Sequence, residues 1–174
     1  MCDGDDRVVG PLRELREPLH AGLHQVQVAA GAVSESEPRM AIAAVETAWR
    51  YLQEVFVPAC IDEHASLFVA VETILNTREA LTALRMQHES LTSMVLDLEK
   101  VVKAVRDAGS VEEYRRYLLP LLHGLYAAIR VHIESEDDAL LSLLDVHLTS
   151  EQVEAVCAGL ASAAQRRAIA ATDP

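Results

Sequence analysis

The feature that most constrains the fold is a run of eight residues spaced alternately three and four positions apart. These residues are Leu81, Leu84, His88, Leu91, Val95, Leu98, Val102 and Val105. The spacing places them along one face of an α-helix, which is typical of a helix packed in a bundle. Seven of the eight are aliphatic, and His88 is the exception. Because burying an unpaired polar group costs about 1–3 kcal/mol, the sequence predicts that His88 has a partner in the core.

A second run, nearer the end of the chain, has the same type of spacing and two polar members. Its residues are Leu125, Ile129, His132, Glu136, Leu140 and Leu143. His132 and Glu136 lie four residues apart and therefore one turn apart on the same helix face. Several buried polar groups in one core need a shared partner. A metal ion would satisfy all of them, because neutral imidazole and carboxylate are both metal ligands.

Breaks between the apolar runs predict helices at about residues 11–33, 38–75, 77–107, 110–147 and 149–170. Pro58 should kink the second helix. Capping boxes are expected at Ser110 with Glu113 and at Thr149 with Gln152. Since short connections make neighbouring helices antiparallel, the predicted fold class is all-α, an antiparallel up-down-up-down four-helix bundle with an additional C-terminal helix. We expect a flexible N-terminus over residues 1–10, the bundle over 11–148, and the last helix and tail over 149–174.

Composition narrows the classes of function. The net charge is −12 and no basic stripe is present, which argues against nucleic-acid binding. No apolar run reaches the roughly 18–20 residues that span a bilayer, and the acidic start is unlike a signal peptide. The three cysteines are odd in number and far apart, which is typical of free thiols in a reducing compartment. We therefore expect a soluble cytoplasmic protein without a nucleic-acid or membrane partner. The oligomeric state is left open, and a homo-oligomer is one of the alternatives.

Further polar residues are expected to face inward. Glu63 belongs to the apolar arc of the second helix, and His64 lies about 100° round from it. Asp62, Ser66 and Thr73 mark the solvent side of that helix. Among the acidic residues of the fourth helix, only Glu136 lies on the apolar line. Glu134, Asp137 and Asp138 are therefore assigned to a solvated face. In the first helix His20 lies at the edge of the apolar line Leu12, Leu15, Leu19 and Leu23, four residues after Arg16.

Three segments resemble motifs of the hemerythrin-like (HHE cation-binding) family over most of the chain. The segment from Leu125 to Asp138 is similar to the fourth-helix pattern, in which a His is followed four residues later by the first of several acids. Gln87-His88-Glu89 resembles the third-helix histidine motif, and the stretch from Phe56 to His64 resembles the second-helix motif. The resemblance implies a four-helix bundle holding non-haem iron, as a di-iron centre, with His and Glu ligands. It also implies a protein that carries or senses dioxygen, or acts on nitric oxide or peroxide.

The chain departs from the family pattern at several positions. Ala59 occupies the place of a second-helix histidine, and His64 that of the second paired acid. Arg16 stands where the family has a first-helix histidine. Leu140 and Ser142 replace the Tyr and Pro that follow the fourth-helix acids. The ligands that carry over are therefore His88, His132, Glu136 and Glu63, while His20 and His64 are candidates to replace the missing ones.

Three functions remain open from the sequence. The first is a non-haem iron protein, di-iron or mononuclear, that binds a small gas or oxidant. The second is a regulatory or protein-interaction module with little or no metal, in which Arg16 neutralises Glu63 or Glu136 by ion pairing. The third is a ferritin-like di-iron oxidase, for which only Glu17 and His20 supply the required Glu-x-x-His pair. Whether the protein is an enzyme is left open, and the residues alone would also accept zinc or manganese.

Overall fold

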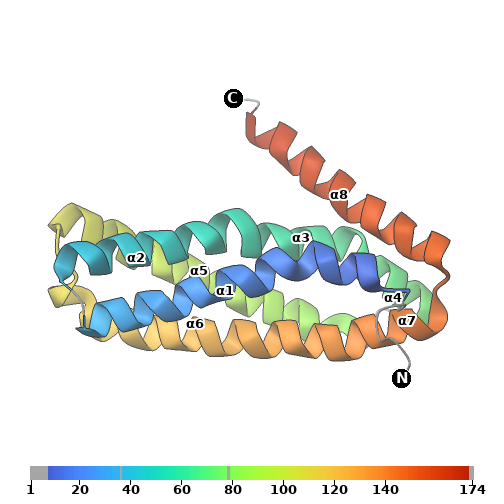
Figure 1. Ribbon diagram of the computed structural model, residues 1–174, viewed down its shortest axis with the longest axis horizontal. Coiled ribbons are helices and arrows are strands. Elements are labelled where there is room, and N and C mark those ends of the chain that lie inside the picture. Colours follow the sequence, from blue (N-terminus) through green and yellow to red (C-terminus); the bar gives the residue numbers. More distant parts are fainter. Residues whose placement is uncertain (1–7, 36, 78, 173–174) are drawn as a thin grey trace, which may run out of the picture. The chain divides into compact units, whose positions relative to one another are not determined.

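The computed structural model describes residues 8–35, 37–77 and 79–172, and every regular element in these ranges is helical. The α-helices are α1 (Gly10–Glu35), α2 (Pro38–Tyr51), α3 (Val57–Ala65), α4 (Leu67–Leu75), α5 (Thr82–Ala108), α6 (Arg115–Glu136), α7 (Ser142–His147) and α8 (Ser150–Thr172) (Figure 1). Two π-helical turns, η1 (Leu52–Phe56) and η4 (Asp137–Leu141), and two 3₁₀ turns, η2 (Glu79–Leu81) and η3 (Glu112–Tyr114), complete the set. The predicted all-helical class is confirmed. Among the described helices, none combines the length and apolar character that crossing a bilayer demands.

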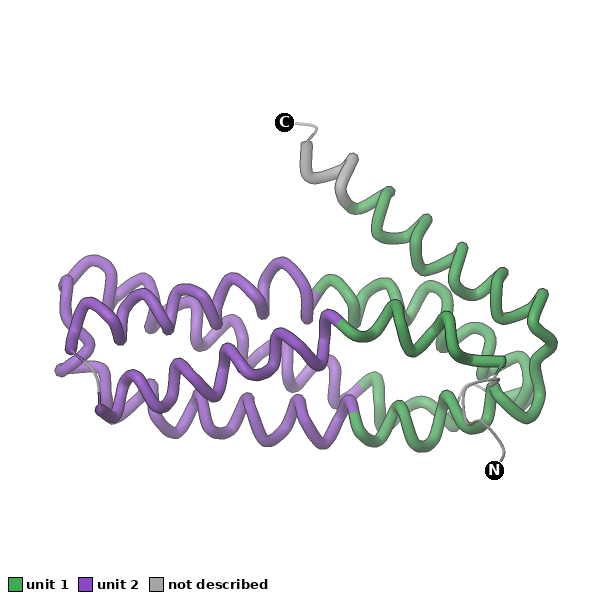
Figure 2. Tube along the Cα trace, viewed as in Figure 1, with its two compact units in different colours: residues 1–17, 58–85, 134–174 green, residues 18–57, 86–133 purple. Residues whose placement is uncertain are grey.

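The chain divides into two compact units (Figure 2). Unit 1 comprises residues 1–17, 58–85 and 134–174, and unit 2 comprises residues 18–57 and 86–133. All four boundaries fall inside helices, namely α1, α3, α5 and α6, so each of these helices contributes residues to both units. Residues 1–7 of the expected flexible N-terminus lie outside the described residues. Val9, which precedes α1, is fully buried.

Unit 2 is built from helical segments that contact one another in pairs. The hydroxyl of Tyr51 on α2 donates to the carbonyl of Leu19 on α1 over 2.7 Å. Arg115, which begins α6, donates to the carbonyl of Ser34 on α1 over 2.8 Å. The apolar face predicted for the third helix is buried from His88 to Val105, as its spacing requires. This burial fixes which face of α5 points inward, and with it the position of His88.

Unit 1 has its own apolar core, which includes the start of α1. The buried members are Val9, Leu12, Leu67, Phe68, Val71, Leu81, Leu140, Leu141, Leu144, Val153 and Val156. α8 joins this core: Ser66 donates from its hydroxyl to the carbonyl of Val156 over 2.9 Å. Arg167 of α8 pairs with Asp62 of α3 at 2.5 Å. The expectation that Asp62 faces solvent is therefore wrong, because α8 covers that side of α3 and leaves Asp62 only 7% exposed.

The helix predicted over residues 38–75 is interrupted twice. The π-helical turn η1 comes directly before Pro58, and a break at Ser66 separates α3 from α4. A proline ring clashes with the carbonyl four residues earlier, and a wider turn relieves this clash. The capping box of Thr149 and Gln152 is present. The backbone N–H of Thr149 donates to Oε1 of Gln152, and the backbone N–H of Gln152 donates to Oγ1 of Thr149. Ser110 instead accepts from the amide of Glu112, and a 3₁₀ turn begins there.

Gly22→Ala should destabilise the protein, although alanine is favoured over glycine in a helix by about 1 kcal/mol. A methyl group there would clash with the buried ring of Tyr51, whose hydroxyl is anchored to Leu19. Because overpacking costs about 1–3 kcal/mol, we expect a net loss of about 1–2 kcal/mol in the free energy of unfolding, measured with urea. Gly31→Ala is the matched control on α1, since nothing lies within 4 Å of the added carbon. It should raise stability by about 0.5–1 kcal/mol, and equal effects of both substitutions would contradict the close approach at Gly22.

Candidate metal centre

Within unit 1, three carboxyl groups surround the guanidinium of Arg16. Arg16 is only 4% exposed. Its Nη1 pairs with Glu63 of α3, and its Nη2 donates to Oε2 of Glu136, the last residue of α6, over 2.8 Å. Its Nε donates to Oδ1 of Asp137 over 3.0 Å. Arg16 therefore holds together side chains that lie 47 to 121 residues away in the chain.

One position on the inward face of α1 differs from the expected apolar line. Leu12, Leu19 and Leu23 are buried as expected. Leu15 is 49% exposed, whereas its neighbour Arg16 is buried. A buried carboxylate without a partner costs far more than one exposed leucine. The five donors of a guanidinium form a fixed fork that can serve several carboxylates, whereas a lysine has three donors on one nitrogen and a histidine at most two. The ion pairs therefore explain this one position, and the rest of the face follows the apolar pattern.

Asp137 is a functional residue that the sequence pattern assigned to the solvated face. Successive residues of a regular α-helix point about 100° apart, so Glu136 and Asp137 should not reach the same partner. The π-helical turn η4 begins at Asp137 and widens the backbone there. As a result, both side chains contact Arg16. The spacing of apolar residues carries no signal for such a turn.

One positive charge faces three acidic groups in this cluster. Burial is the main cause that raises the pKa of Glu63 to about 8; the charge of Glu136 adds to this shift, and Arg16 opposes it. For Arg16, burial alone would lower the pKa, but Glu63, Glu136 and Asp137 outweigh this effect and the pKa is raised. Arg16 therefore stays charged but does not by itself neutralise the acids around it. Burial also raises the pKa of the nearby Cys60 thiol, with smaller contributions from Glu63 and Glu136.

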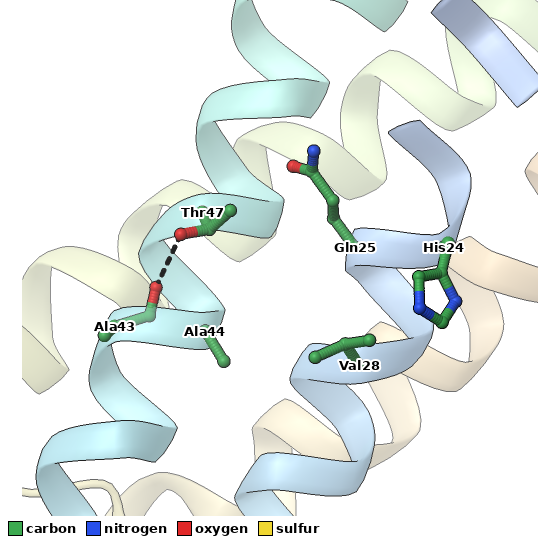
Figure 3. Close-up of a pocket in the computed structure, with 6 residues that line it drawn as sticks. All are labelled: His24, Gln25, Val28, Ala43, Ala44 and Thr47. Atoms are coloured by element: carbon green, nitrogen blue, oxygen red, sulfur yellow. Dashed lines mark hydrogen bonds between the residues drawn. The ribbon is translucent and has the colours of Figure 1, made fainter. Parts of the chain in front are cut away.

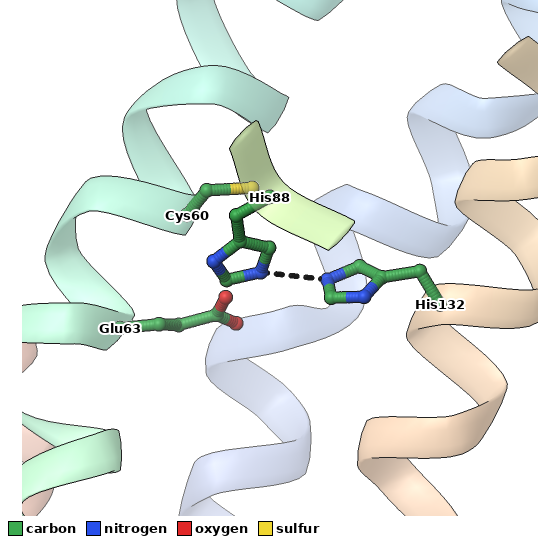
Figure 4. Close-up of side chains that lie close together, drawn as sticks. All are labelled: Cys60, Glu63, His88 and His132. Atoms are coloured by element: carbon green, nitrogen blue, oxygen red, sulfur yellow. Dashed lines mark hydrogen bonds between the residues drawn. The ribbon is translucent and has the colours of Figure 1, made fainter. Parts of the chain in front are cut away.

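Within unit 2, two buried histidines are bonded to each other. Nε2 of His88 on α5 and Nε2 of His132 on α6 lie 2.7 Å apart, and each side chain belongs to a residue only 2% exposed (Figure 4). Nδ1 of His132 lies 3.0 Å from Oε1 of Gln87. An amide oxygen only accepts, so Nδ1 of His132 carries the proton and its Nε2 presents a lone pair. This is the tautomer in which a histidine can bind a metal through Nε2.

Among the residues that the structure describes, those that could hold a metal ion are Cys60 and Glu63 in unit 1 and His88 and His132 in unit 2. Cys60 and Glu63 are both buried on α3, three residues apart and so on neighbouring positions of one face. Figure 4 draws these four side chains. Cys60 is not among the ligands expected from the family pattern, and its spacing of three residues from Glu63 is the signal in the sequence that could have indicated it.

The other predicted ligands have different surroundings. Glu136 is held by Arg16. His20 lies on an exposed position of α1. His64 is half-buried, with its ring centroid 5.0 Å from that of Phe68. A ligand role for His20, His64 or Glu136 stays a prediction.

Arg16→Met should lower the free energy of unfolding by about 3–5 kcal/mol, because it leaves buried carboxyl groups without their cation. Arg16→Lys keeps the charge but not the several directed donors, so we expect a smaller loss. Urea denaturation of both variants, with the exposed Arg39→Met as the control, measures the difference. A loss of under about 1 kcal/mol for Arg16→Met would contradict the ion-pair cluster.

Arg39→Met changes an arginine to the same apolar side chain as Arg16→Met does, but at an exposed position outside the buried cluster. Surface substitutions of this kind usually stay within about 0.5 kcal/mol. The control therefore separates the loss of the cluster from the loss of a surface charge.

Comparison with known proteins places this arrangement in a family. The model of the hemerythrin HHE cation-binding domain matches residues 13–144, which covers most of the chain. Neither a curated protein nor a solved structure matches the chain significantly. The matched range contains all of the residues described above as candidate ligands, together with Arg16. The chain therefore belongs to the hemerythrin HHE cation-binding domain family.

Proposed function

We propose that this protein binds one metal ion, iron, through Cys60, Glu63, His88 and His132, and that it handles a small gas or oxidant there. The observation that carries the proposal is the ligand group itself. Each unit offers two buried donors: Cys60 and Glu63 lie three residues apart on α3, and the Nε2 atoms of His88 and His132 lie 2.7 Å apart. All four side chains are buried. The proposed scaffold is an antiparallel up-down-up-down four-helix arrangement, which the short connections from α1 to α2 and from α5 to α6 support.

The donor set suits a transition metal. Imidazole, carboxylate and thiolate are all ligands of iron, and they also accept zinc. Gln87 fixes the ring of His132 through Nδ1, as an outer partner of a metal-binding histidine commonly does. Cys60 would bind as a thiolate, so its proton must leave on metal binding. Bound iron would supply Lewis-acid and redox chemistry toward dioxygen, nitric oxide or peroxide.

Arg16 favours one metal ion over two. Its guanidinium is permanently charged and cannot ligate a metal. It pairs with Glu63, Glu136 and Asp137, and so occupies the acidic groups that a second cation would need. We propose that Arg16 takes the place of that second cation. Glu63 would then face the guanidinium with one oxygen and leave the other for the metal.

The same ion pairs favour a second candidate function, a bundle that acts as a regulatory or protein-interaction module with little or no metal. In that case Arg16 serves only to neutralise buried acids. The two candidate functions differ in metal content, and the ion pairs alone do not distinguish them. We propose a cytoplasmic location for either one, supported by the free thiols of Cys60 and Cys157 among the described residues.

Protein produced with iron supplied should contain about one metal ion per chain, measured by elemental analysis. His88→Ala and His132→Ala should each lower the content about tenfold or more, because each removes a proposed ligand. His24→Ala is the control, since His24 lies on an exposed position of α1. Two irons per native chain would contradict the single-metal site. No bound metal would contradict the iron site and leave the second candidate.

The double substitution Arg16→His with Ala59→His should raise the metal content toward two ions per chain. It removes the fixed cation and places imidazoles where the family has histidines. Ala59→His alone is the control, because Arg16 still pairs with the acids. An unchanged content in the double variant would show that Arg16 does not exclude a second ion.

Cobalt(II) loaded in place of iron should show the intense near-ultraviolet absorption of a cobalt–thiolate bond. Cys60→Ser should abolish this band, because an alcohol does not replace a thiolate as a soft ligand. Cys157→Ser is the matched control, since Cys157 lies on α8 and outside the proposed ligand group. A band that survives in Cys60→Ser would rule out Cys60 as a ligand.

A further inference from the structure

Within unit 1, α8 contacts one side of α3, the helix that carries Cys60 and Glu63. Nη1 of Arg167 on α8 pairs with Asp62 at 2.5 Å and donates to the carbonyl of Pro58 over 3.1 Å. Nearer the start of α8, a backbone carbonyl accepts from the hydroxyl of Ser66 over 2.9 Å. Pro58, Asp62 and Ser66 are spaced four residues apart, so they follow one another along a single side of the helix. α8 therefore holds α3 from its first turn to the residue after its end.

The proposed ligands of α3 lie away from this line of contacts but depend on the same short helix. α3 has nine residues, a π-helical turn precedes it, and a break at Ser66 follows it. Isolated helices shorter than about 12–15 residues are marginal in water, so α3 depends on its packing. The amide of Ser66 donates to the carbonyl of Glu63 over 3.3 Å. The residue that α8 holds is thus bonded to the backbone of a proposed ligand.

The contact between α8 and Ser66 is closely fitted. A carbon added at Gly159 of α8 would overlap with Oγ of Ser66, so only glycine leaves room for this side chain. The groove between α1 and α2 in unit 2 is a contrast, since it is an open space of about 270 Å³ (Figure 3). Thr47 at its edge donates to the carbonyl of Ala43 in its own helix, over 2.9 Å. Ser66 instead bonds to a different helix, as a contact that fixes two elements together requires.

α8 is built as a separable element. The domain that defines the family ends at residue 144, before α8 begins. Two residues, Leu148 and Thr149, connect α8 to α7. Among the side chains of α8 that the structure describes, those that are buried are Val153, Val156 and Ala163. Segments with few buried apolar contacts open at a lower free energy than the core, so α8 can undock while the rest of the fold persists.

We propose that α8 is a clamp on the metal site. Docked α8 fixes α3 and with it the positions of Cys60 and Glu63, whereas undocked α8 lets α3 move and weakens metal binding. The proposal rests on the proposed function and adds the way in which that site is regulated. Arg167 and Ser66 are positioning residues, because they act on α3 and not on the metal. By linkage, a metal ion that binds only the fixed form of α3 stabilises docked α8 to the same extent.

Hydrogen exchange in the metal-free protein tests the clamp independently of any metal. Arg167→Ala should speed exchange about tenfold at the backbone amides of α3 and α8, because it removes both contacts of the guanidinium. The amides of α5 should stay within about twofold. Arg166→Ala is the matched control, since it removes the neighbouring arginine, which is exposed. Unchanged exchange in α3, or an equal acceleration in α5, would overturn the clamp.

The release of iron to a chelator tests the link to the metal site in iron-loaded protein. Arg167→Ala should speed release about tenfold, and Arg166→Ala should leave the rate within about twofold. Arg167→Lys keeps a positive charge for Asp62 and should restore part of the slow release. An unchanged rate in Arg167→Ala would overturn the regulation of the site by α8. If the protein binds no iron, the proposed function fails, and hydrogen exchange still decides whether α8 clamps α3.

Discussion

Unit 1 depends on one buried guanidinium. Arg16 brings together Glu63 from α3, Glu136 from α6 and Asp137 from the turn that follows. Moving charged groups out of water costs several kcal/mol per ion, and such a cluster persists only when its donors and acceptors meet in good geometry. In α1 the cluster accounts for the burial of Arg16 in place of Leu15, while Leu12 and Leu19 stay buried on the same face. It also fixes the orientation of the two buried glutamates.

The two π-helical turns lie beside the candidate site residues. η1 contains Phe56, whose ring meets the ring of His132 edge-on at a centroid distance of 6.3 Å within unit 2. η4 begins at Asp137 and lets it reach Arg16 beside Glu136 in unit 1. A single wide turn rotates every later residue relative to the earlier ones. These turns therefore decide which polar side chains of a helix face inward together.

The proposed single metal ion explains features that the ion pairs leave unexplained. Arg16 supplies one positive charge to three acidic groups, so the cluster holds more acidic groups than its one cation can neutralise. In unit 2, the tautomer set by Gln87 leaves a lone pair on Nε2 of His132. Cys60 adds a buried thiol on the same face of α3 as Glu63. The acidic groups and the thiol of unit 1, and the imidazole pair of unit 2, are each of the kind that binds a transition-metal cation.

Much of the fold and part of the site follow from the sequence alone. Apolar spacing determined the helical class and the buried face of α5, because the period of a helix decides which residues share a side. The same spacing identified His88, His132, Glu63 and Glu136 as buried polar residues, and all four are buried.

The tertiary structure decided the rest. The inward turn of Arg16 depends on carboxylates far away in the chain, and the burial of Asp62 depends on α8. The pairing of Asp137 with Arg16 depends on a π-helical turn, which the spacing of apolar residues does not predict. The sequence by itself determined which residues are apolar or polar on each helix face. Only the tertiary structure decided which polar groups meet, because ion pairs and local widening of a helix act between residues that the local pattern does not connect.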